Sequence, residues 1–118
     1  MIHRISTRAA FRSLSRSRQR ASSDLFTVVH SAGPPDPPDS GIGLACATPR
    51  SLGSAVVRNR ARRRIRSVAR EWAREHPSDR GWYLVVAGRK AATAEYGDVR
   101  DDLRSLLATL QWTARGTS

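Results

Sequence analysis

The chain has 118 residues, the size of one domain, with 21 Lys and Arg against 10 Asp and Glu, which gives a formal net charge of +11. Such a surplus of positive charge repels itself unless a polyanion neutralises it, so the composition predicts a nucleic acid or an acidic membrane surface as partner. The single cysteine, Cys46, excludes a disulfide framework and a cysteine zinc site, and no apolar run approaches the ~20 residues of a membrane span.

The N-terminal residues predict a short helix followed by a basic loop. Residues 6–14 can form a helix that places Ala10, Phe11 and Leu14 on one face. Residues 15–23 are polar and carry an arginine at every second position from 16 to 20. This pattern suits either a flexible arm that lies on phosphates or a solvated loop.

The composition of the first twenty residues bears on localisation. They are rich in Arg and Ser and hold no acidic residue, as in a transit peptide, but they lack the apolar segment of a secretory signal. We expect a cytoplasmic protein, with a transit peptide as the lesser alternative.

Two strands separated by a proline-rich loop come next. Residues 25–30 (LFTVVH) are rich in β-branched and aromatic side chains and predict a strand. Residues 31–41 hold four prolines, which cannot donate in a ladder, so we expect a mobile connecting loop. Residues 42–48 (IGLACAT) predict a second strand whose odd positions hold only Gly and Ala. We expect a helix to cover this bare face, with an extended RNA strand as the alternative.

Residues 54–76 predict a long helix that Gly53 precedes and Pro77 ends. At about 100° per residue, one packed stripe collects its large apolar side chains. This stripe contains Val57, Ala61, Ile65, Val68 and Trp72. The opposite arc is covered by arginines, and carboxylates appear only late, at Glu71 and Glu75. Because a solvated helix face ordinarily mixes both signs of charge, we interpret this face as a polyanion-binding surface.

The last part of the chain predicts a strand, a helix and a tail. Residues 82–87 (WYLVVA) are apolar throughout, as in a strand covered on both faces. Asp98 can cap a final helix, and residues 113–118 form a polar tail. A core stripe runs along this helix through Val99, Leu103, Leu106, Leu107 and Leu110. The pattern predicts one α+β domain, a two-layer α/β sandwich in which strands 42–48 and 82–87 are parallel because a helix connects them.

No catalytic constellation is found among the residues. His3, His30 and His76 fall on three separate elements, without a carboxylate or cysteine cluster at metal-ligand spacing. Asp36 and Asp39 lie in the proline-rich loop, where loop solvation explains them. We therefore expect neither a catalytic residue nor a metal site in the protein, and any chemistry belongs to its partner.

The stretch from Gly53 to Arg66, GSAVVRNRARRRIR, carries a specific motif. It resembles the G-x-A-V-x-R-N-R-x-(K/R)-R-x-x-R signature of the bacterial ribonuclease P protein component. Every defined position is filled: Gly53, Ala55, Val56, Arg58, Asn59, Arg60, Arg62, Arg63 and Arg66. Tyr96-Gly-Asp is similar to the tyrosine followed by acidic residues at the start of the family's last helix.

The resemblance implies a fold, an activity and two RNA partners. The fold is α-β-β-β-α-β-α with a left-handed βαβ crossover, whereas pattern alone favours the usual right-handed one. The activity is endonucleolytic 5′ maturation of tRNA, in which the protein binds the catalytic RNA of ribonuclease P and the single-stranded 5′ leader of precursor tRNA. The catalytic RNA holds the Mg²⁺ ions, so the protein itself needs no cofactor. Neither DNA nor a membrane is an implied partner.

The resemblance also assigns residues to the two RNA partners. Contact with the catalytic RNA is implied for Arg58, Asn59, Arg60, Arg62, Arg63, Arg66 and Arg70. Contact with the leader is implied for Arg8, Phe11, Arg12, Leu14, Ala45, Ala47 and Arg50. Phe11 can stack on a leader base, with core packing as the equal alternative. The chain departs from the family at Ser15, where a second aromatic is common, and at Pro49 and Ser51, which replace part of a Ser-Lys-Lys.

Two other functions compete with this one. The first is a general RNA-binding or ribosome-associated structural protein with a similar small fold. The second is a DNA-binding module that places the arginine helix in a major groove. An unbroken arginine face argues against the second, because base readout uses a few polar residues among smaller ones, whereas arginines in a row mainly grip phosphates.

Overall fold

The computed structural model describes residues 2–4, 12, 14–31, 42–76 and 81–116. Its strands are β1 (Ile2–Arg4), β2 (Gln19–Ser22), β3 (Phe26–Ser31), β4 (Ile42–Ala47) and β5 (Trp82–Ala87). Its long helices are α2 (Ala55–Glu75) and α3 (Tyr96–Gly116), and two short 3-10 helices, η1 (Arg50–Leu52) and η2 (Arg89–Ala92), precede them. Arg12 and residues 14–16 are also helical.

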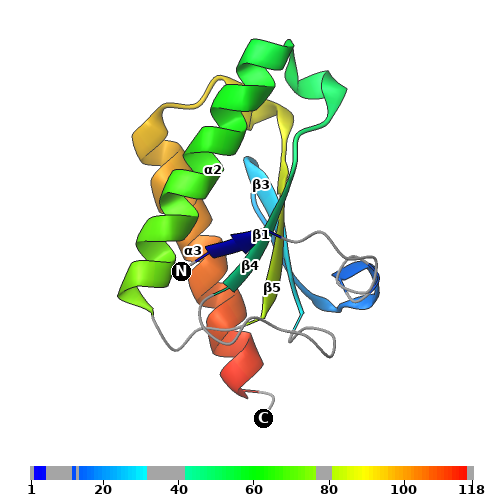
Figure 1. Cartoon of the computed structure of the whole chain (residues 1–118), viewed down its shortest axis with the longest axis vertical. Helices are drawn as coiled ribbons and strands as arrows, with labels where there is room; N and C mark the ends of the chain where they lie inside the picture. The colour runs from blue at the N-terminus through cyan, green and yellow to red at the C-terminus, as the bar shows by residue number, and fades with distance from the viewer. Residues whose placement is uncertain (1, 5–11, 13, 32–41, 77–80, 117–118) are drawn as a thin grey trace.

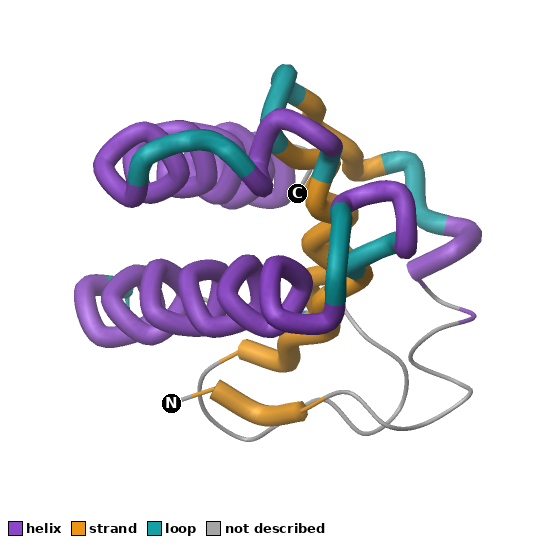
Figure 2. Tube along the Cα trace, turned by 90° about the horizontal axis from the view of Figure 1, so that it is seen from above, coloured by secondary structure: helices purple, strands orange, loops and turns teal. Residues whose placement is uncertain are grey.

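The strands form one mixed sheet in the order β1-β4-β5-β3-β2. β4 is parallel to β5, as the sequence predicts from the helix between them, and β1 is parallel to β4. β3 pairs antiparallel with β5, and β2 with β3. Helices α2 and α3 lie side by side on one face of this sheet (Figures 1 and 2). The α+β class and the α-β-β-β-α-β-α order are confirmed, with β1 as an additional short edge strand.

The core lies between the sheet and the two long helices. From α2 it takes the predicted stripe, in which Ile65 and Val68 are fully buried, together with Ala69 and Ala73. From α3 it takes the whole predicted stripe. The stripe of α3 consists of Val99, Leu103, Leu106, Leu107 and Leu110. Each of these large aliphatic side chains contributes about 1.5–3 kcal/mol by leaving water, so both helices are held by burial of one face.

Both ends of α2 follow from local chemistry. Gly53 has φ +144°, a conformation that other residues rarely adopt, and it turns the chain into the helix. The Ser54 side chain then accepts a hydrogen bond from the backbone N–H of Val57 at 3.4 Å, as an N-cap does. At the other end the His76 ring stacks on Trp72, with ring centroids 3.7 Å apart. The predicted helix over 54–76 is confirmed to within one residue at each end.

The prediction of a loop over residues 15–23 is wrong at β2. Only four residues form this edge strand, and every second side chain is exposed, so its polar composition resembles a loop. Tertiary contacts stabilise it: the Gln19 Oε1 atom lies 2.7 Å from Nδ1 of His30, and the Ser22 and Thr27 hydroxyls are 3.2 Å apart.

The bounds of the final helix also differ from the prediction. α3 begins at Tyr96, so Asp98 lies inside the first turn and is not the cap. The helix continues to Gly116, which places residues 113–116 of the predicted tail inside it, because no helix breaker precedes that glycine. The proline-rich loop lies outside the described residues except for Ser31, the last residue of β3.

The Gly and Ala face of β4 is turned away from α2 and α3, and the helical residue Leu14, rather than either long helix, packs over part of it, as the expectation of a covering helix requires. Leu44 and Ile42 face those helices, and the opposite face receives the indole of Trp82 over Gly43. Leu14, which is 1% exposed, packs there against Val29 and Trp82. The helical residues around it lie on the side of the sheet away from α2 and α3 (Figures 1 and 2).

Substitution of Gly43 by Ala tests this packing. A Cβ at Gly43 would lie 1.8 Å from Cε3 of Trp82, so the indole must move. We expect a loss of about 1–3 kcal/mol in the free energy of unfolding, measured by urea denaturation. Gly97→Ala is the matched control, because a Cβ there meets nothing within 4 Å and Ala favours the helix by about 0.5–1 kcal/mol. A Gly43→Ala protein as stable as the wild type would contradict the packing.

Candidate nucleic-acid interface

The arginine face of α2 is the surface from Arg58 to Arg70 that points away from the sheet. All seven residues assigned to the catalytic RNA lie on this one helix. Five of them are exposed, and Arg58 and Arg62 are half-buried along its flanks. The exposed members are Asn59, Arg60, Arg63, Arg66 and Arg70. Because the apolar stripe fixes the rotation of the helix, these side chains are brought together on its outer surface.

The positive charge of this face is not balanced by carboxylates. Among the described residues, every ion pair involves Lys90, Arg100 or Arg104, and none involves an arginine between 58 and 70. The face therefore presents a row of cations, which is the electrostatic requirement for binding a polyanion.

The two carboxylates of α2 form ion pairs with arginines of α3. Glu71 accepts hydrogen bonds from Arg100, including one from Nε at 3.1 Å, and its Oε1 atom lies 3.2 Å from Nη1 of Arg104. Glu75 pairs with Arg104. The bond from Arg100 and the nearby arginine charges lower the pKa of Glu71. These pairs join the C-terminal part of α2 to α3, so the acids that the helix does contain are directed away from its arginine face.

Two arginines on the flank of α2 are oriented by neutral acceptors. Arg60 donates from Nη2 to the carbonyl of Ala92 at 2.8 Å, and Arg64 donates from Nη1 to the carbonyl of Ala94 at 2.9 Å. A carbonyl fixes the direction of a guanidinium without cancelling its charge, and four further N–H donors stay available. The end of η2 and the segment that follows it therefore orient both cations and leave N–H donors for a further acceptor.

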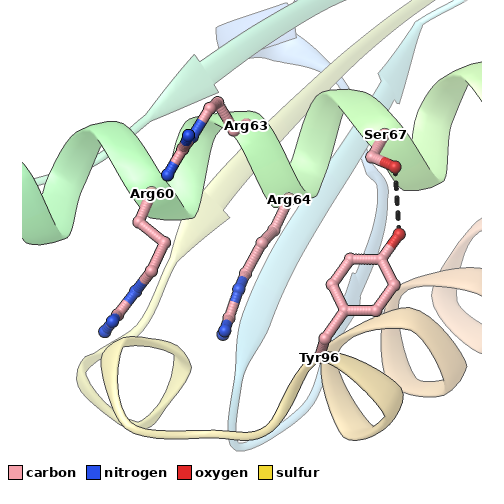
Figure 3. Close-up of a pocket in the computed structure, with 5 residues that line it drawn as sticks. All are labelled: Arg60, Arg63, Arg64, Ser67 and Tyr96. Carbon is pink, nitrogen blue, oxygen red and sulfur yellow. Dashed lines mark hydrogen bonds between the residues drawn. The ribbon is translucent and has the colours of Figure 1, made fainter.

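A pocket opens where α2 meets the start of α3. It is lined by Arg60, Arg63, Arg64, Ser67 and Tyr96. Figure 3 shows Arg60 and Arg64 extending from α2 toward the segment before α3, and Tyr96 reaching back toward Ser67. The two hydroxyl oxygens are 3.0 Å apart. The sequence indicates Tyr96 only through the family resemblance, because its contact with Ser67 across 29 residues is not visible in a helical projection.

The residues assigned to the leader are only partly brought together. Ala45 and Ala47 are half-buried on the sheet face away from α2 and α3, beside Leu84 and Val86 of β5. Leu14 is buried on this same face, against Val29 and Trp82, so it covers part of the face and its role is packing. We call this surface of β4 and β5 the open sheet face.

The remaining leader residues lie at the margins or outside the described ranges. Arg12 and Arg50 are exposed, and Arg50 begins η1 directly after Pro49. Arg8 and Phe11 lie outside the described residues. Arg20, one of the arginines predicted to lie either on phosphates or in a solvated loop, is exposed and sits opposite Val29 in register, on the same side as the open sheet face.

The side chains of Cys46 and His30 contribute to packing. Burial raises the pKa of the Cys46 thiol, while the charges of Arg66 and Arg62 oppose that rise, and the thiol packs against the core between sheet and helices. His30 is buried against Tyr83, with ring centroids 4.6 Å apart. Within the described ranges no three side chains of the metal-binding types come together. None of the helices described there is long and apolar enough to cross a membrane.

Fold and surface together define a small basic α+β protein of the RNA-binding class, with a row of arginines along one helix. Arginine suits this role because its planar fork grips a phosphate with two hydrogen bonds.

Comparison with known proteins identifies the family. The family model "Ribonuclease P" matches residues 2–111. The ribonuclease P protein component of Kocuria rhizophila is 36% identical over 110 residues, covering 91% of this chain and 90% of that protein. The component of Gluconacetobacter diazotrophicus is 38% identical over 108 residues, covering 86% and 89%. The chain therefore belongs to the ribonuclease P protein family.

Solved structures show the same fold. The RNase P protein of Staphylococcus aureus superposes with a TM-score of 0.74 at 21% identity, covering 90% of this chain and 93% of that one. The protein of Thermotoga maritima superposes with a TM-score of 0.73 at 21% identity, covering 89% and 94%.

The lowered pKa of Glu71 predicts how stability depends on pH. A carboxylate whose pKa is lower in the folded state contributes stability above its unfolded pKa, and that contribution is lost as pH falls through the folded value. The urea midpoint should therefore decrease between about pH 5 and pH 3, and Glu71→Gln should make this decrease shallower. Arg100→Gln removes the same hydrogen bonds from the other side and should act alike. An unchanged pH dependence in Glu71→Gln would contradict the contact.

Proposed function

We propose that α2 docks the protein onto the catalytic RNA of ribonuclease P through its arginine face. Membership of the family makes the chain the protein subunit of this endoribonuclease, which acts in the 5′ maturation of tRNA. The observation that carries the docking role is the row of arginines between 58 and 70 without a carboxylate partner among the described residues. A folded RNA supplies the dense phosphates that such a row neutralises.

The open sheet face is the proposed site for the single-stranded 5′ leader of precursor tRNA. Ala45 and Ala47 leave room for a strand of RNA to approach the backbone, and Leu84 and Val86 offer apolar contact to bases. Arg12, Arg20 and Arg50 supply exposed charges for leader phosphates. Arg8 and Phe11 complete the proposed set. Stacking and phosphate contacts tolerate many sequences, which suits a protein whose substrates carry different leaders.

Hydrolysis is assigned to the catalytic RNA and not to the protein. In this proposal the Mg²⁺ ions belong to the catalytic RNA, and the protein positions both RNA partners. The left-handed crossover from β4 through α2 to β5, implied by the family, belongs to the same proposal. So does a cytoplasmic location, where precursor tRNA is processed.

Addition of the protein at low Mg²⁺ tests the function. We expect the cognate catalytic RNA to cleave precursor tRNA slowly alone at low Mg²⁺ and at least about tenfold faster with the protein, because bound arginines replace part of the charge neutralisation that the ions provide. Cleavage of a 5′-labelled precursor measures the rate. Binding to the catalytic RNA without any rescue would contradict the proposal and favour a general RNA-binding protein.

The salt dependence of binding tests the docking surface. The affinity for the catalytic RNA should fall steeply with salt, and Arg62, Arg63 and Arg66 changed together to Ala should flatten the log–log slope by about 2 to 3, since each phosphate contact contributes about 0.7 to 0.9. The matched control changes Arg16, Arg18 and Arg74, which are exposed and lie outside the motif. Filter binding at several salt concentrations measures both. Equal flattening by the two triple variants would show that only net charge matters.

A further inference from the structure

We propose that the pocket between α2 and the start of α3 seats one backbone phosphate of the catalytic RNA. This proposal deepens the docking role of α2 and rests on it. It assigns to the interface three residues that are not defined positions of the arginine motif, Arg64, Ser67 and Tyr96, and so extends the RNA-binding surface from one helix onto a second.

The chemistry of the lining selects an anion. Three arginines line the pocket, and among the described residues no carboxylate does, although Glu95 and Asp98 are close to Tyr96 in the sequence. A phosphodiester oxygen accepts charge-assisted hydrogen bonds from guanidinium groups, which are about twice as strong as neutral ones.

Two of the three cations are oriented before any ligand arrives. Arg60 and Arg64 are held by the carbonyls of Ala92 and Ala94, and Arg63 lies between them in the sequence on the exposed side of α2 (Figure 3). Less side-chain freedom is lost on binding when the donors are already oriented, so a preformed pocket binds more tightly than mobile surface arginines. This separates the pocket from the rest of the arginine face.

The paired hydroxyls close one side of the pocket. Ser67 Oγ and Tyr96 Oη are 3.0 Å apart, and either atom can donate to the other. Two hydroxyl protons share one hydrogen bond, so the second proton is available for a phosphate oxygen. Tyr96 is 38% exposed, and the pair therefore borders solvent where a ligand enters.

The location of the pocket favours the catalytic RNA over the leader. The pocket belongs to the helical layer, whereas the open sheet face lies on the other side of the sheet (Figures 1 and 2). A leader on the open sheet face would have to pass around the sheet to reach Tyr96. The phosphate in the pocket therefore comes from the RNA that contacts α2.

The test compares charge and hydroxyl variants for binding to the catalytic RNA. Arg63→Gln and Arg64→Gln should each weaken binding about tenfold, and Tyr96→Phe about threefold, because each loses donors to one phosphate. Tyr96→Phe is the sharpest variant, since it changes no charge and keeps the ring. The matched controls are Arg74→Gln, at the exposed end of the same helix, and Ser105→Ala, which removes an exposed hydroxyl from α3. Thermal melting of each variant reports on its fold.

Ethylation interference then shows whether one phosphate is involved. Randomly ethylated catalytic RNA is separated into bound and free fractions with the wild type and with each variant. With the wild type, we expect ethylation of one particular phosphate to weaken binding. This effect should be lost in Arg63→Gln, Arg64→Gln and Tyr96→Phe alike, and it should persist in both controls. An unchanged interference pattern, or pocket variants that bind like the controls, would overturn the proposal.

The same variants separate this proposal from the docking role itself. Wild-type protein that neither binds nor rescues the catalytic RNA would refute the proposed function. Wild-type protein that rescues cleavage, with pocket variants that bind like the controls, would refute only the pocket. Affinity for precursor tRNA, measured in the reconstituted complex, should be the same for Tyr96→Phe and the wild type, and a selective loss there would assign the phosphate to the substrate instead.

Discussion

Packing of α2 on the sheet determines where each charged side chain of this helix can lie. Ile65, Val68 and Trp72 are buried along one stripe, and this burial fixes the rotation of the helix about its axis. An arginine turned into the core would lose its hydration without a partner, which costs several kcal/mol. Each motif arginine must therefore point to solvent or run along a flank. The apolar residues thus determine the geometry of the charged ones.

The two halves of α2 differ in whether their charged side chains have partners of opposite charge. Toward its C-terminus, Glu71 and Glu75 join Arg100 and Arg104 of α3, which couples the two helices. Toward its N-terminus, like charges follow one another closely, and their repulsion opposes folding of the free protein. The buried stripe and the interhelix pairs offset this repulsion. A protein arranged in this way gains stability when a polyanion binds, because the partner removes the repulsion.

Much of the fold could be predicted from the sequence where a periodic pattern runs over many residues. The stripe in 54–76 and the apolar run in 82–87 set α2 and β5 to within a residue. β2 was not predictable in this way, because four half-polar residues at a sheet edge have no pattern of their own and depend on partners such as His30. The indole of Trp82 over Gly43 is a contact between elements far apart in the chain, and no local pattern contains it.

In the candidate site, too, the features within one element could be predicted and the contacts between elements could not. The arginine face could be predicted because its residues share one helix, and the motif within it indicated the protein family. The pocket could not, because Tyr96 reaches Ser67 from another helix and Arg64 is fixed by a backbone carbonyl 30 residues away. Side chains that act across elements require the fold before their role can be seen.

Arginine footprinting on the protein tests most directly that α2 is the docking surface. Phenylglyoxal modifies accessible arginines, and mass spectrometry compares the free protein with its complex with the catalytic RNA. We expect protection of Arg60, Arg63 and Arg66 in the complex, with Arg16 and Arg74 modified as in the free protein. Continued modification of the three α2 arginines in the complex, with protection concentrated elsewhere, would show that α2 is not the docking surface.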